Sequence, residues 1–298
     1  MAHHRVPRQK GMLMTESGRL RRPTTPKTKT VLDQMVGRYS KHYQIPQARI
    51  RNWISFMVVA GALERVSDER GTTAFVVKGG VALELRLRMR ARATKDFDAV
   101  FRHEFGELTD VLDRAFAEPY GDFRFERLGE ARDLRGKATR LEVRVEYRGK
   151  AWATVQLEVS VAKGHVVESE RVRATDLSEL GLDGPEFIPC LSARFQIAQK
   201  IHAVTTPERE GRENTRHRDL VDLWLLRELG TELSDLRSAC EEVFLTRGMH
   251  SWPPEVRVPE EWAEPFFRLA HEIGMPIQDV HEAAAGLREW IAEIDRAK

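Results

Sequence analysis

A glycine pair between an apolar run and a helical pattern is the feature that most restricts how this chain folds. The run Phe75-Val76-Val77 leads into Lys78-Gly79-Gly80, and a helix-like stretch follows. This order predicts a strand, a tight turn and a helix N-terminus, where glycines let backbone amides approach a phosphate closely. No P-loop pattern accompanies the turn. We therefore expect Lys78, Gly79 and Gly80 to bind nucleotide phosphate; the alternative is a turn that only requires positive φ.

Two aspartates follow the glycine turn, on a second strand expected over residues 96–100. Asp96 and Asp98 stand at i and i+2, and alternation along a strand sends both side chains to the same side. Two carboxylates together supply the hard oxygen ligands that Mg²⁺ prefers. A metal beside a phosphate-binding turn predicts transfer chemistry on a nucleoside triphosphate (NTP). The alternative is a D-x-D sequence in an ordinary surface turn.

The pattern changes to strict alternation further along the chain. Apolar and polar residues alternate over 141–147 and again over 155–160, on either side of a short loop at 148–150. Two such runs around a glycine-containing loop predict an antiparallel hairpin with one buried face. Glu158 falls on the polar face of a strand that we expect next to the aspartate strand. There it is a candidate third carboxylate for a second metal that activates an attacking hydroxyl. Alternatively, Glu158 is a solvated strand residue.

The order of the remaining patterns predicts the fold class. Two helices are expected between residues 31 and 66 and a third over 107–117, and helical patterns dominate after Pro189. Sheet first and helices afterwards argue for an α+β fold with a helical C-terminal half. We expect a basic arm at 1–30, a core at 31–188 with the N-terminal helices, a helical domain at 189–298 and a linker at 207–214. The helices expected after Pro189 cover 192–206, 215–230, 234–247, 259–273 and 277–296.

Composition restricts the compartment and the class of partner. The chain has 298 residues, 41% of them hydrophobic, and a net charge of +2, so it can bury a core and is not a polycation. Two distant cysteines without C-x-x-C predict a reducing, cytoplasmic location, and no apolar run is long enough to predict a membrane span. Residues 1–30 hold eight Lys/Arg and one acid, which predicts disorder. That arm is either an inert terminus or an RNA-binding extension.

Charged residues inside the C-terminal helical patterns are further candidates. Lys200 neighbours an apolar stripe, so its stem can pack while its ammonium reaches a cleft and contacts triphosphate oxygens. Asp219 and Asp222 lie at i and i+3 on one helical face, where they can orient Lys200 or the nucleotide. The alternatives are a surface lysine and ordinary salt bridges between the aspartates and Arg216 or Arg218.

Taken together, these motifs resemble those of a known family. The chain resembles the AbiEii/AbiGii nucleotidyltransferase toxins, including the MenT toxins of mycobacteria, which belong to the DNA polymerase β-like nucleotidyltransferase superfamily. The resemblance covers roughly residues 70–230 and rests on the order and spacing of the motifs rather than on any one of them. They are KGGxAL at Lys78–Leu83, RxxKDFD at Arg92–Asp98, the Glu158 strand, QKI at Gln199–Ile201 and RxRDxxDL at Arg216–Leu223.

The resemblance implies a polymerase β-like core and roles for individual residues. Asp96 and Asp98, with Glu158, would bind Mg²⁺; Lys200 would contact nucleotide phosphate; and Asp219 or Asp222 would have an essential acidic role. Thr94 would lie at the nucleotide site, in a small-hydroxyl position that many relatives share. Relatives act as toxins of toxin–antitoxin systems, and several transfer a nucleotide from an NTP to the 3′ end of tRNA, which blocks aminoacylation and growth. The implied partners are an NTP, tRNA and a cognate antitoxin.

The acceptor is the least constrained part of this reading. A tRNA acceptor needs a basic surface, and five basic residues near the site are candidates for phosphate contacts: Arg86, Arg88, Arg90, Arg92 and Lys95. The alternative is a helix face with solvated arginines. The same site could instead nucleotidylate or phosphorylate a protein partner, and a catalytically silent RNA- or antitoxin-binding module on this fold is a third possibility.

Overall fold

A mixed sheet forms the N-terminal part of the protein. The computed structural model describes residues 23–134, 136, 138–162, 167–207 and 216–298, and in this part of the chain a seven-stranded sheet has the order β3-β4-β5-β2-β1-β7-β6. Pairing is antiparallel except between β1 and β7 and between β2 and β5. The strands are β1 Phe75–Val77, β2 Asp96–Phe101, β3 Phe123–Asp133, β4 Thr139–Tyr147, β5 Lys150–Val161, β6 Ser169–Arg173 and β7 Phe187–Leu191.

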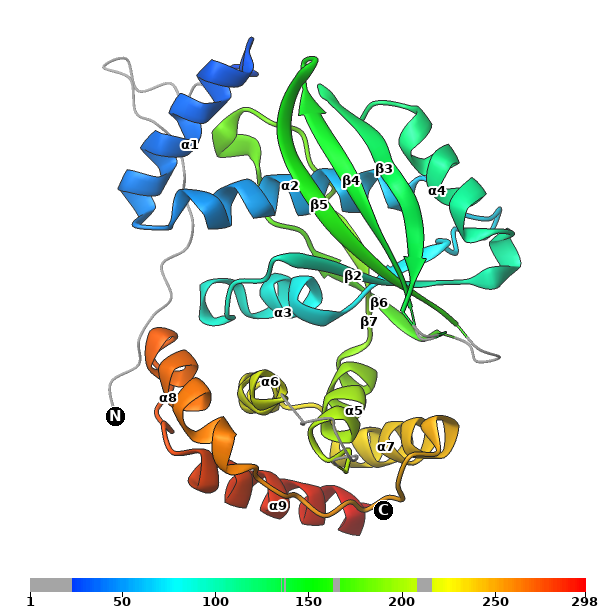
Figure 1. Ribbon diagram of the computed structural model, residues 1–298, viewed down its shortest axis with the longest axis vertical. Coiled ribbons are helices and arrows are strands. Elements are labelled where there is room, and N and C mark those ends of the chain that lie inside the picture. The colour runs from blue at the N-terminus through cyan, green and yellow to red at the C-terminus, as the bar shows by residue number, and fades with distance from the viewer. Residues whose placement is uncertain (1–22, 135, 137, 163–166, 208–215) are drawn as a thin grey trace.

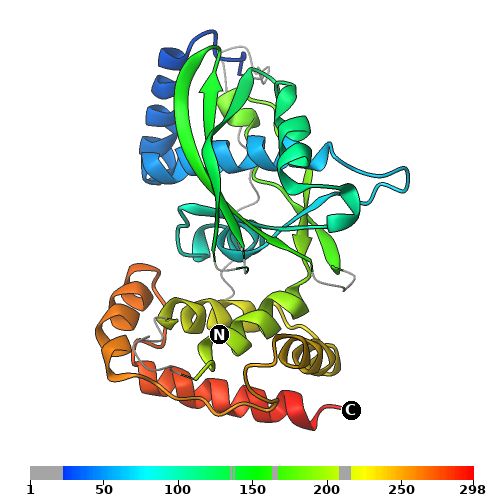
Figure 2. The same cartoon turned by 45° about the vertical axis from the view of Figure 1, so that its right-hand side comes forward.

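Helices cover the sheet and form the C-terminal part. Helix α2 crosses the sheet, and α3 lies between the sheet and the C-terminal helices (Figures 1 and 2). No helix in the described part of the chain combines the length and apolar content needed to cross a membrane. The α-helices are α1 Lys29–Tyr43, α2 Gln47–Glu64, α3 Gly79–Leu87, α4 Leu108–Ala117, α5 Ala193–Val204, α6 His217–Arg227, α7 Leu233–Arg247, α8 Ala263–Glu272 and α9 Val280–Arg296.

The observed elements confirm the predicted α+β class with a helical C-terminal half. The expected hairpin is β4–β5, and its predicted apolar positions, such as Leu141, Val143 and Leu157, are buried. The two strands at the edges of the sheet were not predicted. In β3 and β6 most side chains are exposed or half-buried, so neither strand has the buried, alternating face that makes a strand recognisable.

The boundary between the two parts differs from the predicted one. Strand β7 pairs with β1 and β6, so the sheet ends at Leu191 and a division at 188/189 falls inside a strand. Moreover, Leu83 and Leu87 of α3 are buried in the same apolar cluster as α5 to α9. Helix α3 therefore contributes to the apolar core at the sheet and to the one among the C-terminal helices, and it joins the two parts.

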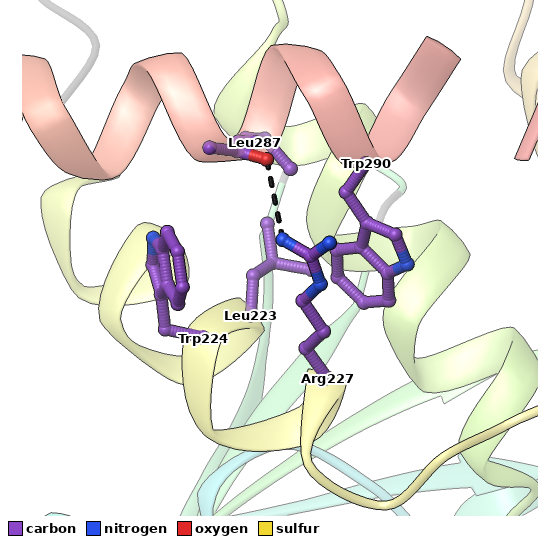
Figure 3. Close-up of a pocket in the computed structure, with 6 residues that line it drawn as sticks. Leu223, Trp224, Arg227, Leu287 and Trp290 are labelled. Atoms are coloured by element: carbon purple, nitrogen blue, oxygen red, sulfur yellow. Dashed lines mark hydrogen bonds between the residues drawn. The ribbon is translucent and has the colours of Figure 1, made fainter. Parts of the chain in front are cut away.

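The helical part is closely packed where α6 meets α9. Arg227 lies between Trp224 and Trp290 and donates a hydrogen bond to the Gly286 carbonyl (Figure 3). The cavity between these residues and Leu287 has a volume of only about 10 Å³, which is about the size of one water molecule. This junction is structural, and a nucleotide does not fit there.

Residues 23–30, the end of the predicted disordered arm, have a defined structure. The Tyr147 hydroxyl donates a buried hydrogen bond of 2.6 Å to the carbonyl of Pro26, and Thr28 caps helix α1, which begins at Lys29. The prediction is therefore wrong for residues 23–30, because a core tyrosine holds this segment against the sheet. Residues 1–22, and the predicted linker apart from Pro207, lie outside the described residues.

Candidate active site

The glycine turn is pressed directly against the aspartate strand. Gly79 begins α3 with φ 61°, in the left-handed region, and a Cβ atom there would overlap the Asp98 carboxylate. A Cβ atom on Gly80 would lie 2.5 Å from Thr94 Oγ1. Both glycines are thus explained by close approach, since any larger residue would push the N-terminus of α3 away from β2. The amides of α3 and the aspartates share one small volume.

The three candidate carboxylates lie on one face of neighbouring strands. Strands β2 and β5 are parallel and in register, with Asp96 opposite Gln156 and Asp98 opposite Glu158, which confirms that the Glu158 strand adjoins the aspartate strand. Burial raises the pKa of Asp98, and the charges of Glu158 and Asp96 add to this effect while Lys78 opposes it. Like charges are crowded here, and a bound cation would relieve their repulsion.

One oxygen of Glu158 is bound by an arginine from the neighbouring strand. Its Oε1 accepts hydrogen bonds from Nε and Nη2 of Arg140, at 3.0 and 2.5 Å. Among the residues that the structure describes, no group of three or more Asp, Glu, His or Cys side chains is arranged to hold a metal ion. Asp96 and Asp98 by themselves provide hard oxygen donors that suit Mg²⁺. The aspartate pair is therefore the candidate donor set, and Glu158 stays a predicted third ligand with one oxygen already bound to Arg140.

Lys78 places a positive charge beside these carboxylates. Its backbone amide donates to the Asp98 carbonyl at 2.9 Å, and its Nζ donates to Ser160 Oγ at 2.8 Å. Burial lowers the pKa of Lys78, although Asp98 and Glu158 counteract the shift. The ammonium group thus reaches β5, the strand that carries Glu158.

Lys200 projects from α5 into a buried ion-pair network. Its Nζ donates to Asp219 Oδ1 and to Asp222 Oδ2, both at 2.7 Å. Burial alone would lower the pKa of Lys200, but the two carboxylates raise it. Burial alone would likewise raise the pKa of Asp219, yet Lys200 and Arg216 hold it below its ordinary value. The charges in this cluster fix one another, and Asp219 and Asp222 both hold the Lys200 ammonium.

Arg92 belongs to the same network and not to an exposed basic surface. Its Nε and Nη2 donate to the two oxygens of Asp222, each at 2.9 Å. The Asp222 side chain is completely buried, and that of Arg92 is 16% exposed. A guanidinium committed in this way is not available to an RNA phosphate. This is a correction to the expectation for Arg92, because its carboxylate partner lies 130 positions away in the sequence.

Arg86 is also turned inward, contrary to its predicted role. Its side chain is only 5% exposed and donates to Gln196 Oε1 at 2.6 Å and to the Leu191 carbonyl at 2.5 Å, as well as to Glu170. Gln196 in turn donates from Nε2 to the Gly79 carbonyl at 2.9 Å. Arg86 therefore supports the glycine turn through Gln196 and does not face RNA.

The other candidate RNA contacts lie on the surface. Arg88 and Lys95 are exposed, and Arg90 is exposed while paired with Glu228. Their role in RNA binding stays a prediction. Thr94, by contrast, is buried against Gly80, and its hydroxyl donates to the Asp96 carbonyl at 3.3 Å. It orients the aspartate strand and offers little surface to a nucleotide.

Three residues near the site were missed by the sequence analysis: Gln196, Arg140 and Arg247. Gln196 is only 2% exposed. A polar residue that interrupts the apolar face of a helix is a signal that the sequence contains. Arg140 stands opposite Glu158 across the hairpin, which the alternation pattern allows but does not identify. Arg247 comes from the end of α7 and carries no local signal.

The site combines a glycine turn packed on a pair of strand carboxylates with two lysines from different elements. This arrangement suits nucleotidyl transfer. A family model described as the nucleotidyl transferase AbiEii toxin of type IV toxin–antitoxin systems matches residues 61–287. The chain therefore belongs to the AbiEii nucleotidyltransferase toxin family, as the resemblance of its motifs indicated. Membership implies a nucleotide substrate and an antitoxin partner.

Solved structures include a protein similar to this chain. MenT4, a nucleotidyltransferase toxin from Mycobacterium tuberculosis H37Rv, is similar at 15% identity with a TM-score of 0.49, over 91% of this chain and 90% of that chain. The search of curated proteins gave no match to the chain.

Proposed function

We propose that this toxin transfers a nucleoside monophosphate from an NTP to the 3′-hydroxyl of tRNA, with Mg²⁺, and so blocks aminoacylation and growth. The observation that carries the proposal is the packing of the Asp96–Asp98 strand against the α3 N-terminus, where a Cβ at Gly79 would overlap Asp98. This contact puts a candidate metal site and a candidate phosphate site within one volume. The cytoplasm, where tRNA and NTPs occur, is the proposed location.

The residues of the chain have distinct roles in this reaction. The acceptor hydroxyl attacks the α-phosphorus and loses its proton, the bond to the β-phosphate oxygen breaks, and pyrophosphate leaves. Asp96 and Asp98 would hold Mg²⁺, which when bound neutralises charge on the triphosphate. The amides of Gly79 and Gly80 at the helix N-terminus and the Lys78 ammonium orient the phosphates. These groups are fixed before substrate binds, which favours stabilisation of developing charge.

The buried network contributes by holding Lys200 in place. Lys200 already donates to two aspartates, and an ammonium has three donors in all, so one remains for a phosphate oxygen. Arg92 holds Asp222 from the opposite side. We infer that Asp222 positions Lys200 and does not itself touch the substrate, whereas Asp219, with 13% of its side chain exposed, borders the site.

The proposal is tested by incubating the purified protein with total tRNA, Mg²⁺ and each common NTP carrying ³²P at the α-phosphate. The wild type should label tRNA with a preference among the bases, and Asp96→Asn should abolish labelling. The exposed Asp183→Asn is the matched control and should label normally. Label on a protein instead of tRNA would replace the RNA acceptor with a protein acceptor. No label with any NTP would contradict the proposal.

A further inference from the structure

A cleft opens beside the edge strand β6, at the end of β2 that lies away from Asp96. Its volume is about 470 Å³, which is enough for a small ligand or for one unit of a polymer. The loop after α2, the residue that follows β2, and strands β6 and β7 supply its walls. Three of the residues that line it are arginines from three different segments: Arg70, Arg102 and Arg171.

Arg102 is the buried arginine of the three, with 9% of its surface exposed. Its Nη1 donates to the Thr73 carbonyl, and its Nη2 donates to the Val167 carbonyl at 2.8 Å and to Ser169 Oγ at 3.3 Å. All three acceptors are uncharged, so they orient the guanidinium without neutralising it. A guanidinium carries five N–H donors. In the described part of the chain these contacts use three of them, so two donors remain for a ligand.

Arg70 and Arg171 add exposed guanidinium groups to the cleft. The loop that carries Arg70 is held by Asp68, whose Oδ1 accepts from the Arg70 amide at 2.9 Å. Arg171 stacks on Phe187, with its guanidinium carbon 4.9 Å from the ring centroid, and this contact limits its orientations. Within the described residues, no ion pair joins Arg70, Arg102 or Arg171 to a carboxylate.

Two carboxylates, those of Glu64 and Glu170, also line the cleft but do not balance the arginines. Glu170 already pairs with Arg86 of α3 at 2.6 Å. Burial raises the pKa of Glu64, which weakens its charged form, while Arg171 opposes the shift. With Arg86 included, four guanidinium groups lie beside two carboxylates, which leaves two positive charges in excess. The cleft therefore favours an anionic ligand.

The cleft is separate from the candidate active site, although both lie on one face of the sheet. Arg102 follows Asp98 by four residues, and this even spacing directs both side chains to the same face. At the usual rise along a strand, the two positions are about 13 Å apart. Val100, which lies between them, is buried with Val76 and Leu191 in a small apolar cluster. This cluster separates the arginines of the cleft from the aspartate pair.

We propose that this cleft is a second phosphate-binding site, which holds a phosphate group of bound RNA or of a free nucleotide. This inference goes beyond the proposed function, because the cleft lies outside the group of residues that would perform the transfer. Guanidinium groups from three segments can surround the oxygens of a tetrahedral phosphate, whereas a planar carboxylate needs only one guanidinium fork. Among the described residues that line the cleft, none is aromatic. Recognition there therefore rests on the phosphate and not on stacking of a base.

The test is modification of individual arginines by phenylglyoxal, measured by mass spectrometry on the full-length wild-type protein without Mg²⁺. The probes are total tRNA, adenosine monophosphate (AMP) and, as a carboxylate control, sodium acetate at matched ionic strength. A probe that binds the cleft should slow modification of Arg70 and Arg171 about 10-fold at about ten times its dissociation constant. Acetate should leave the rates unchanged. The exposed Arg268, which pairs with Glu264 on α8, is the control residue and should react equally under all conditions.

The outcomes identify the source of the phosphate. Protection by tRNA alone assigns the cleft to RNA, protection by AMP alone assigns it to free nucleotides, and protection by both assigns it to either source. No protection by tRNA or AMP overturns the inference. Equal protection by acetate, or protection that extends equally to Arg268, overturns it too.

A variant tests the same site through affinity. Arg171→Ala changes an exposed side chain and should weaken binding of the protecting probe about 10-fold, as followed by the protection of Arg70. An unchanged affinity would overturn the inference. Failure here is distinguishable from failure of the proposed function, because modification requires no transfer. If wild type labels no tRNA but a phosphate probe still protects Arg70 and Arg171, the acceptor assignment fails and the cleft site stands.

Discussion

Substituting Gly79 by alanine tests two properties of a glycine at this turn. It adopts a left-handed backbone, and it leaves room for Asp98. Gly79 has φ 61°, and a Cβ there would overlap the Asp98 carboxylate and lie 2.9 Å from Asp98 Cβ. Because Asp98 Cβ belongs to the rigid strand, rotating the carboxylate does not remove the clash. Gly71 has a similar φ of 77°, and a Cβ there would meet no atom within 4 Å. The two glycines therefore form a matched pair.

The magnitudes follow from these geometries. Left-handed backbone costs an alanine about 1–2 kcal/mol, which applies at both positions. Overpacking against β2 adds about 1–3 kcal/mol at Gly79 alone. We expect Gly71→Ala to lower the free energy of unfolding by about 1–2 kcal/mol and Gly79→Ala by about 2–5 kcal/mol. Because the clash displaces Asp98 or the α3 amides, the transfer rate should fall about 100-fold in Gly79→Ala, and stay near wild type in Gly71→Ala.

Guanidinium denaturation followed by circular dichroism measures the stabilities, and labelling of tRNA from an α-³²P NTP measures the rates. Equal losses of stability in both variants would show that the approach of Asp98 to Gly79 contributes nothing. Retention of more than about a third of wild-type transfer by Gly79→Ala would show that this contact does not set the site geometry.

Three further predictions concern buried charges. Asp222→Ala should lower the free energy of unfolding by about 3–5 kcal/mol, because it leaves Arg92 without its carboxylate. Urea denaturation measures this change. A loss below about 1 kcal/mol would show that the buried ion-pair network does not stabilise the fold. Burial raises the pKa of Glu84 to about 7 despite Arg49. Protonation of Glu84 therefore favours the folded state. The stability that this group contributes is complete below its unfolded pKa and is lost as pH rises towards about 7. Glu84→Gln should therefore remove a decline of about 3 kcal/mol between pH 4.5 and 7 in denaturation experiments, and an unchanged pH profile would argue against it. Arg86→Ala should reduce transfer by releasing the glycine turn, without altering the salt dependence of tRNA binding; a smaller salt slope would restore its predicted RNA role.

Local spacing made the centre of the site predictable. The turn at Gly79 and the pair Asp96–Asp98 each need only a few consecutive residues, so their pattern is complete in the sequence. The alternation of the hairpin likewise identified the polar face that carries Glu158, and β5 pairs with β2 as expected. The pattern did not indicate that Arg140 binds the Glu158 carboxylate, because an arginine at that position is equally compatible with a solvated strand residue.

The basic residues after the glycine turn were harder to interpret. Helix α3 ends at Leu87, and Arg88 has φ 57°, so the alternating arginines do not share one helical face. Arg86 and Arg92 are instead bound to groups more than a hundred positions later in the chain, Gln196 and Asp222. Long-range contacts of this kind leave no local signature in the sequence.

In the proposed function, the aspartate pair directs nucleotidyl transfer to the 3′ end of tRNA. The most direct measurement compares intact tRNA with tRNA whose 3′-terminal ribose has been oxidised by periodate, each incubated with wild type or Asp96→Asn, Mg²⁺ and α-³²P-labelled NTPs. We expect label only on intact tRNA incubated with the wild-type protein. Label on the oxidised tRNA, or equal labelling by the Asp96→Asn variant, would contradict it.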